Sequence, residues 1–208
     1  MKDFIDQLQQ QLQQPLPGRD VQYEMAHAVR RSYQEVPATA KKAGVLALFY
    51  PKDAAWHIVL IERTAKNPND RHKGQISFPG GRYEPEDGDL SVTALREAEE
   101  EVGVSSTSIE LLGKLTDLYI PVSNFAVFPY VGFTPNRPEF TPQQSEVHAI
   151  LEVPFNVLAA PNSVSRMDLK ISQQITLQQV PYFDVAGKVV WGATAMMLNE
   201  LIAITRQG

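Results

Sequence analysis

One short segment concentrates acidic side chains at helical spacing. REAEEEVG, residues 96–103, holds four glutamates and one arginine. At about 100° per residue, Glu97, Glu100 and Glu101 fall within an arc of about 100° on one helix face. Carboxylates this close repel one another, and a hard divalent cation such as Mg²⁺ would turn that repulsion into attraction. The segment on its own therefore fits either a solvated acidic face or a metal site.

The rest of the helix predicts how it is held. Its opposite side carries the aliphatic and small residues Val92, Leu95, Ala98 and Val102, which we expect to pack against the core while the carboxylates point away from it. Asp89 is a suitable N-cap, and Gly103 suits a left-handed C-terminal cap. Glu99 lies at the edge of the apolar side, so it is the least favoured ligand of the four glutamates.

The residues before the helix favour the metal site. Gly80 and Gly81 end the stretch SFPGG, and Asp87 belongs to an acidic turn between these glycines and the helix. Paired glycines allow backbone amides or carbonyls to approach an ion or a phosphate closely. A Gly-Gly pair alone is a weak signal, but Gly-Gly, an acidic turn and an R-E-A-x-E-E-x-G helix, in this order, form a specific pattern.

These segments resemble the Nudix box, whose usual form is G-x5-E-x7-R-E-U-x-E-E-x-G-U, with U a bulky aliphatic residue. The matching residues are Gly81, Arg96, Glu97, Glu100, Glu101, Gly103 and Val104. Asp87 stands where the first glutamate is usual, one extra residue separates it from Arg96, and Ala98 takes the first U position. These departures resemble the variant box of the Nudix coenzyme A pyrophosphatases.

The upstream segment LIERTAKNPNDRHKGQISFPGG resembles the coenzyme A-type signature of that subgroup. The match is carried by Arg63, Arg71, Gly74, Gln75, Phe78, Pro79, Gly80 and Gly81. The resemblance implies that Arg63, Arg71, Gly74, Gln75, Gly80 and Gly81 bind the substrate. Arg71, His72 and Lys73 would add positive charge beside a diphosphate, and a solvated basic loop is the alternative interpretation of this segment.

The resemblance also implies roles for the acidic residues. Glu97, Glu100 and Glu101 would hold Mg²⁺ or Mn²⁺, with the Gly81 carbonyl a further possible ligand. Arg96 would orient these carboxylates, for instance by pairing with Glu100. Two acids keep alternative roles: Asp87 either assists through water or stabilises the turn, and Glu146 is either an additional ligand or a surface residue. Residue type alone does not assign the general base.

The implied reaction is hydrolysis of the diphosphate of coenzyme A or acyl-CoA to 3′,5′-ADP and 4′-phosphopantetheine or its acyl form. A Nudix pyrophosphatase for ADP-ribose, NADH or a similar nucleoside diphosphate derivative is the alternative enzyme. A non-catalytic Nudix-fold module that binds nucleotides is the alternative from another class. The aromatic residues Trp191, Tyr182 and Phe183 are expected in the core rather than against adenine.

Composition limits the function classes. The 208 residues are 43% hydrophobic and carry a net charge of −5, which suits one domain and gives no basic excess for nucleic acid. The chain has no cysteine, and the four histidines offer no i, i+4 pair for zinc. No signal peptide or membrane-length apolar run is evident, so we expect a soluble cytoplasmic protein without a membrane partner.

Periodicity predicts an α/β (α+β) fold. We expect strands at 44–50, 57–63, 109–115, 125–133, 147–153, 168–172 and 175–183, and helices at 1–12, 24–33, 90–103 and 193–204, with a turn at 16–20. The resemblance implies a Nudix-type α/β/α sandwich with a mixed sheet. We expect one Nudix hydrolase domain over 1–208, with an N-terminal helical extension (1–40) and a core (43–208). The first helix either docks on this core or serves a homodimer.

Overall fold

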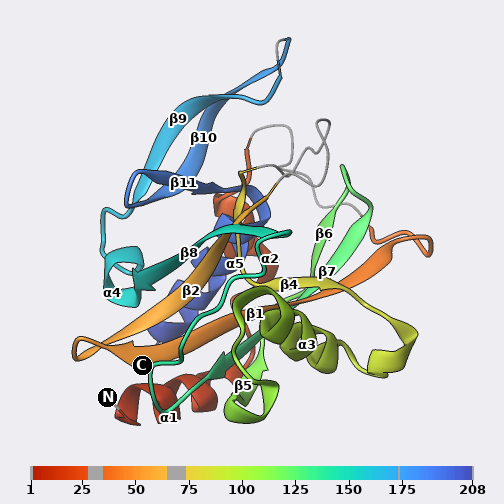
Figure 1. Ribbon diagram of the computed structural model, residues 1–208. Coiled ribbons are helices and arrows are strands. Elements are labelled where there is room, and N and C mark those ends of the chain that lie inside the picture. Colours follow the sequence, from red (N-terminus) through yellow and green to blue (C-terminus); the bar gives the residue numbers. More distant parts are fainter. Residues whose placement is uncertain (1, 28–34, 65–73, 173, 208) are drawn as a thin grey trace.

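A computed structural model describes residues 2–27, 35–64, 74–172 and 174–207 (Figure 1). Arg71, His72 and Lys73, predicted beside the diphosphate, lie outside the described residues. Most of the helix expected over 24–33 also lies outside them.

A mixed sheet, of eight strands within the described ranges, forms the centre of the molecule. Its middle strand β1 (Lys41–Lys52) pairs antiparallel with β2 (Ala55–Arg63) and β4 (Gly80–Arg82), and parallel with β7 (Phe125–Phe133). The outer strands are β3 (Ile76–Ser77) and β8 (Val147–Pro154), both on β2, and β5 (Glu110–Lys114) and β6 (Leu118–Ile120), both on β7.

The central strands are buried on both faces, which explains why their sequences are continuously apolar. In β1, Ala47 and Phe49 join one hydrophobic cluster, while Leu46, Leu48 and Tyr50 join another on the opposite face. Successive side chains of a strand point to opposite faces. A run such as GVLALFY therefore supplies two cores at once, as is usual for a strand covered on both sides.

Helices cover both faces of the sheet. The helix α3 (Leu90–Val102) lies on one side and α5 (Gly192–Thr205) on the other (Figure 1). The remaining short elements are α1 (Lys2–Leu12), α2 (Gly18–Glu24), α4 (Phe155–Leu158) and the 3₁₀ turns η2 (Pro85–Asp87) and η3 (Ser106–Ser108). A mixed sheet between helices confirms the predicted α/β/α sandwich.

The N-terminal segment packs on its own chain. Ile5, Leu8 and Leu12 of α1 are buried in the cluster on the α5 side, and the Phe4 ring lies 5.7 Å from the Phe49 ring. The amphipathic face of α1 is thus used within the chain, as a docking helix requires. Because this face of α1 is buried within the chain, it no longer argues for a homodimer.

The turn predicted over 16–20 was wrong, because α2 already begins at Gly18. The Glu200 carboxylate of α5 accepts hydrogen bonds from the Gly18 amide (3.2 Å) and from Gln22 Nε2 (2.7 Å). Glu200 has no exposed surface. A partner 182 positions away in the chain thus anchors α2, and no local pattern reveals it.

A second, three-stranded sheet contains β9 (Val164–Lys170), β10 (Thr176–Val185) and β11 (Lys188–Trp191). The strand pair expected at 168–172 and 175–183 is confirmed as β9 and β10. Phe183 is buried in the core, as predicted, whereas β11 was not predicted. In the part of the chain that the structure covers, no helix is long and apolar enough to cross a membrane.

Candidate functional site

The acidic helix α3 has the predicted ends. The Asp89 Oδ1 atom accepts a hydrogen bond from the Ser91 amide at 2.8 Å, and Gly103 takes the left-handed conformation with φ 75°. Gly44 of β1 lies directly beneath the first turns of the helix, where a Cβ atom would overlap the Leu90 carbonyl oxygen. The helix therefore rests on the sheet without an intervening side chain.

The close approach at Gly44 changes which helix face is buried. Ala94, Ala98 and Val102 have no exposed surface, and Glu101 is only 2% exposed. Val92, predicted to face the core, is 44% exposed. The prediction that Val92 belongs to the buried side of the helix was therefore wrong. The prediction that all three carboxylates point away from the core was wrong for Glu101.

The three predicted ligands consequently have different surroundings. The exposed fraction of the side chain is 15% for Glu97, 58% for Glu100 and 3% for Glu101. Glu99 is exposed and accepts a hydrogen bond from the Ser106 amide at 3.0 Å, away from the other three. Glu97 and Glu101 thus form the inner part of the candidate site, and Glu100 lies at its solvent margin.

Both oxygens of Glu101 have donors. Oε2 accepts from the Gly80 amide at 2.8 Å, and Oε1 accepts from Arg63 Nη1 at 3.3 Å. Burial raises the pKa of Glu101 to about 7, although the Gly80 hydrogen bond and the Arg63 charge act in the opposite direction. Burial also raises the pKa of Glu97. Both shifts show that the fold places carboxylates where their negative charge is poorly hydrated.

The two glycines of SFPGG belong to strand β4 rather than to a free turn. Gly80 has φ 151°, and a Cβ atom there would overlap the β1 backbone at Gly44. A Cβ atom at Gly81 would overlap the Glu97 carboxylate. Glycine is therefore required twice: once to bring β4 against β1, and once to let the Glu97 carboxylate lie against the backbone of β4.

Arg96 joins the helix to the turn before it. Its Nε and Nη2 atoms donate to the two oxygens of Asp87 at 2.7 and 3.1 Å. Its Nη1 atom donates to Glu97 at 3.1 Å and to Glu100 at 3.3 Å. The predicted pairing of Arg96 with Glu100 is therefore present. The strongest partner, however, is Asp87, whose hydrogen bonds are the main cause of the raised pKa of Arg96.

Asp87 has the role of stabilising the turn. Besides Arg96, it accepts hydrogen bonds from the Glu84 amide (3.1 Å) and from Thr93 Oγ1 (2.8 Å). The hydrogen bonds from Arg96 are the main reason that its pKa lies well below the usual value. Thr93, with no exposed surface, was missed by the sequence analysis, and a polar residue among the small residues of the buried face was the available signal.

Replacing Asp87 by asparagine is expected to lower the free energy of unfolding by about 2 kcal/mol at pH 7, because charge-assisted hydrogen bonds are lost. The depressed pKa of Asp87 contributes stability above its unfolded value, near pH 4, and this contribution is lost as the pH falls. Urea unfolding at pH 7 and pH 3 should therefore show a smaller difference between variant and parent at pH 3. Glu86→Gln, at an exposed neighbour, is the control and should match the parent at both pH values.

The upstream residues approach the site mainly through their backbone. The Arg63 amide donates to the Gln75 carbonyl and the Gly74 amide to the Arg63 carbonyl, both at 3.0 Å. Gly74 has φ 67°. The side chain of Arg63 contacts the box carboxylates through its bond to Glu101.

Glu146 lies close enough to the site for its charge to raise the pKa of both Glu97 and Glu101. The loop before it is held on the end of α3, because the Thr141 amide donates to the Val102 carbonyl at 2.9 Å. The structure therefore brings a fourth negative charge near the site.

Comparison with known proteins gives the family. The NUDIX domain family model matches residues 40–173. Proteins from Yersinia pestis (strain Pestoides F) and Yersinia pseudotuberculosis (serotype O:1b, strain IP 31758), each named "Uncharacterized Nudix hydrolase NudL", are 30% identical over 202 residues, covering 97% of this chain and 92% of the relative. The chain belongs to the Nudix family. It is a hydrolase of phosphoric anhydrides, so the non-catalytic alternative is disfavoured.

Solved Nudix structures share the fold. The Nudix hydrolase RenU from M. smegmatis aligns with a TM-score of 0.54 at 14% identity, covering 81% of this chain and 87% of that protein. A NUDIX hydrolase from Alicyclobacillus acidocaldarius aligns with a TM-score of 0.54 at 16% identity, covering 79% of this chain and 91% of that protein. At these identities the likeness is one of fold.

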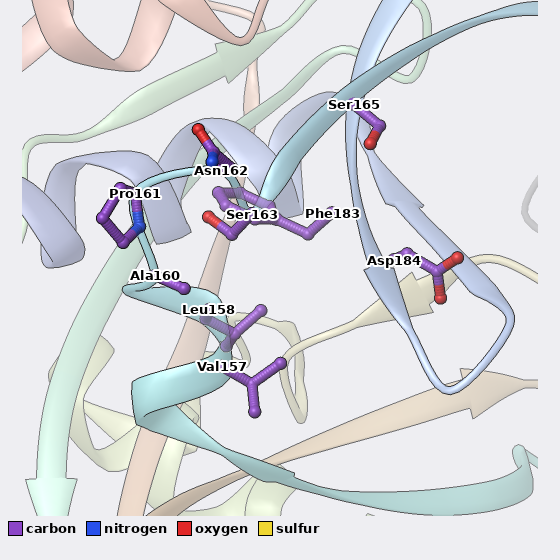
Figure 2. Close-up of a pocket in the computed structure, with 9 residues that line it drawn as sticks. All are labelled: Val157, Leu158, Ala160, Pro161, Asn162, Ser163, Ser165, Phe183 and Asp184. Carbon is purple, nitrogen blue, oxygen red and sulfur yellow. The ribbon is translucent and has the colours of Figure 1, made fainter.

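A pocket of about 430 Å³ lies away from the Nudix box (Figure 2). Its walls come from α4, the loop after it, and strands β9 and β10, and the residues that line it are Val157, Leu158, Ala160, Pro161, Asn162, Ser163, Ser165, Phe183 and Asp184. Leu158 and Phe183 belong to the hydrophobic cluster on the α5 side, whereas α3 packs on the other face. The sheet separates this pocket from the box carboxylates.

Nudix hydrolases generally use divalent ions such as Mg²⁺ or Mn²⁺. The site has the carboxylate oxygens that these hard ions prefer, and the glycine at position 81 leaves room for the Glu97 carboxylate against the backbone. Among the described residues, however, no three Asp, Glu or His side chains already form a metal-binding group. The residues fit such ions in their chemistry.

Proposed function

We propose that this Nudix hydrolase cleaves the diphosphate of coenzyme A or acyl-CoA, producing 3′,5′-ADP and 4′-phosphopantetheine or its acyl form. The observation that carries the proposal is a direct contact between two segments: Arg63, from the segment similar to the coenzyme A-type signature, bonds Glu101 of the Nudix box at 3.3 Å. The two segments that support the assignment therefore form one site.

The box residues hold the catalytic ions in this proposal. Glu97 and Glu100, which have solvent-accessible side chains, would bind Mg²⁺ or Mn²⁺ first, and Glu101 would join them. When bound, such ions would supply polarisation of the phosphorus and activation of the attacking water. Arg96, fixed by Asp87, keeps Glu97 and Glu100 in place on the helix. The Gly81 carbonyl is a further candidate ligand.

The reaction adds water to one phosphorus atom of the diphosphate. The bridging P–O bond breaks, and both products leave as phosphate monoesters while the proton released from water passes to a base. Glu146 is one candidate for that base, because its charge already acts on Glu97 and Glu101. The other candidates are the box carboxylates, since geometry with substrate decides this role.

Basic side chains would recognise the phosphates of the substrate. In this proposal Arg63 contributes its side chain, which contacts Glu101, and Gly74 and Gln75 hold its backbone. Gly80 and Gly81 would contribute their backbone. Arginine suits bidentate phosphate contacts. Arg71 lies outside the described residues, and we propose for it the substrate-binding role that the resemblance implies.

Incubation of the full chain with coenzyme A and Mg²⁺ or Mn²⁺ tests the substrate. We expect chromatography to show 3′,5′-ADP and 4′-phosphopantetheine in equal amounts, with acetyl-CoA, ADP-ribose and NADH as parallel substrates. Rapid cleavage of ADP-ribose or NADH with intact coenzyme A would reject the coenzyme A assignment and select the alternative pyrophosphatase.

Other features remain part of the proposal. We propose that residues 1–208 act as one Nudix hydrolase domain, with 1–40 as an extension of the core at 43–208. Cytoplasmic location and a homodimer stay predictions, to be checked by cell fractionation and by light scattering after size-exclusion chromatography. The expected partner is a nucleotide-like small molecule rather than a nucleic acid or a membrane.

A further inference from the structure

We infer that Arg63 is an exchangeable counterion: it neutralises Glu101 until a divalent cation takes its place, and its guanidinium then binds substrate phosphate. This inference rests on the proposed function, because it requires both cations and a diphosphate ligand. It makes Arg63 a positioning residue for Glu101 in one state and a phosphate ligand in the next.

The first argument is access to Glu101. Its side chain is 3% exposed, and its two oxygens already accept hydrogen bonds from the Gly80 amide and from Arg63. The Gly80 donor belongs to a strand that is paired with β1 and sits without room for a Cβ atom, so it cannot withdraw easily. Arg63 is 26% exposed and ends in a flexible side chain. Of these two donors, Arg63 is the one that can open the way to a cation.

The second argument is charge. A guanidinium and a divalent cation on the same carboxylate repel each other strongly at contact distance. In this structure Glu97 and Glu101 are each paired with an arginine, Arg96 and Arg63 respectively. Arg96 is also held by both oxygens of Asp87, whereas the contact of Arg63 with Glu101 is long, at 3.3 Å. The weaker pair is therefore the one that should yield.

The third argument is reach. The Arg63 backbone is held by Gln75 and Gly74 through two hydrogen bonds of 3.0 Å, so only the side chain needs to move. Released from Glu101, its guanidinium stays beside the carboxylates and within the region where ions would hold a diphosphate. Binding of cations would thus prepare the phosphate site, and the cations and the phosphate ligand would bind cooperatively.

Nuclear magnetic resonance of the ¹⁵N-labelled full chain follows this exchange directly. The Arg63 Nε–Hε signal, assigned with Arg63→Lys, should move when Mg²⁺ alone is added. It should move again when imidodiphosphate, a diphosphate that resists hydrolysis, is added to the Mg²⁺-bound protein. An Arg63 signal that stays unchanged at saturating Mg²⁺ would overturn the inference.

Calorimetry with an uncharged variant gives an independent readout. Because the competing charge is removed, Arg63→Gln should bind Mg²⁺ about five- to tenfold more tightly than the parent, while its complex with Mg²⁺ should bind imidodiphosphate about tenfold more weakly. Arg82→Gln, at an exposed arginine on strand β4, controls for charge at longer range and should stay within about twofold. Equal or weaker Mg²⁺ binding by Arg63→Gln would contradict the exchange.

The outcomes separate this inference from the proposed function. A parent enzyme that binds Mg²⁺ and cleaves coenzyme A with Arg63 still on Glu101 would reject the exchange alone. Cleavage of another diphosphate with the exchange intact would reject only the substrate. A parent that binds no divalent ion would reject the exchange together with the metal-dependent mechanism.

Discussion

Replacing Glu101 by glutamine is expected to lower kcat about a thousandfold while raising the free energy of unfolding at pH 8. The loss of activity follows because the variant removes one negative ligand from the proposed cation site, where metal ions supply several kcal/mol of transition-state stabilisation. The gain in stability follows from burial. The side chain is 3% exposed, and an amide keeps an acceptor for the Gly80 amide without the cost of a buried charge.

The raised pKa of Glu101 determines how the stability gain of the variant changes with pH. Burial raises the folded-state pKa of Glu101 to about 7, whereas the unfolded value lies near 4.3. The protonated form is therefore favoured by folding, and this contribution is present below pH 4 and is lost as the pH rises towards 7. The stability advantage of Glu101→Gln should be larger at pH 8 than at pH 5 by about 2 kcal/mol.

Urea unfolding of metal-free protein and steady-state kinetics with saturating Mg²⁺ check both parts. Glu100→Gln is the informative comparison, because its side chain is 58% exposed: activity should fall strongly with stability unchanged. Glu99→Gln, whose side chain binds the Ser106 amide instead, should keep its activity within about twofold. Full activity in Glu101→Gln and Glu100→Gln would contradict the proposed ligand roles.

The second large effect is expected at Gly44. Gly44→Ala should lower the free energy of unfolding by about 3 kcal/mol, at the upper end of the range for overpacked cores. A Cβ atom there overlaps the Leu90 carbonyl and comes within 2.9 Å of the Ala94 amide, and both belong to the helix backbone. The only relief is to push α3 away from β1, which also moves Glu97 and Glu101 from the Gly80–Gly81 backbone.

Thermal and urea unfolding measure the stability, and kcat should fall even at temperatures where the variant is fully folded. Gly113→Ala is a matched control, because the atoms nearest to its new Cβ belong to Leu12 of α1, so any shift there displaces α1 and not α3. Its cost should be about 1 kcal/mol with unchanged kcat. Equal losses in the two variants would show that the backbone contact with α3 has no special role.

Local patterns predicted much of the scaffold for physical reasons. The ends of α3 follow from residues that act within one turn: Asp89 caps the Ser91 amide, and Gly103 adopts the left-handed conformation. The main strands follow from continuous apolar runs, because a central strand is buried on both faces. The short strand β4 lacks such a run, and its pairing depends on the distant strand β1. The short strand β11 was missed although it pairs with β10, which directly precedes it in the chain.

The amino-acid sequence by itself determined which groups carry the chemistry of this protein. These are three glutamates at helical spacing after a Gly-Gly pair, together with Arg96 and Asp87, which position them. The tertiary structure alone decided that these glutamates are unequal, with Glu101 buried beneath Arg63 and Glu100 in solvent. The physical reason is the contact at Gly44, since a helix that touches the sheet backbone must bury the face nearest to it, whatever charge that face carries.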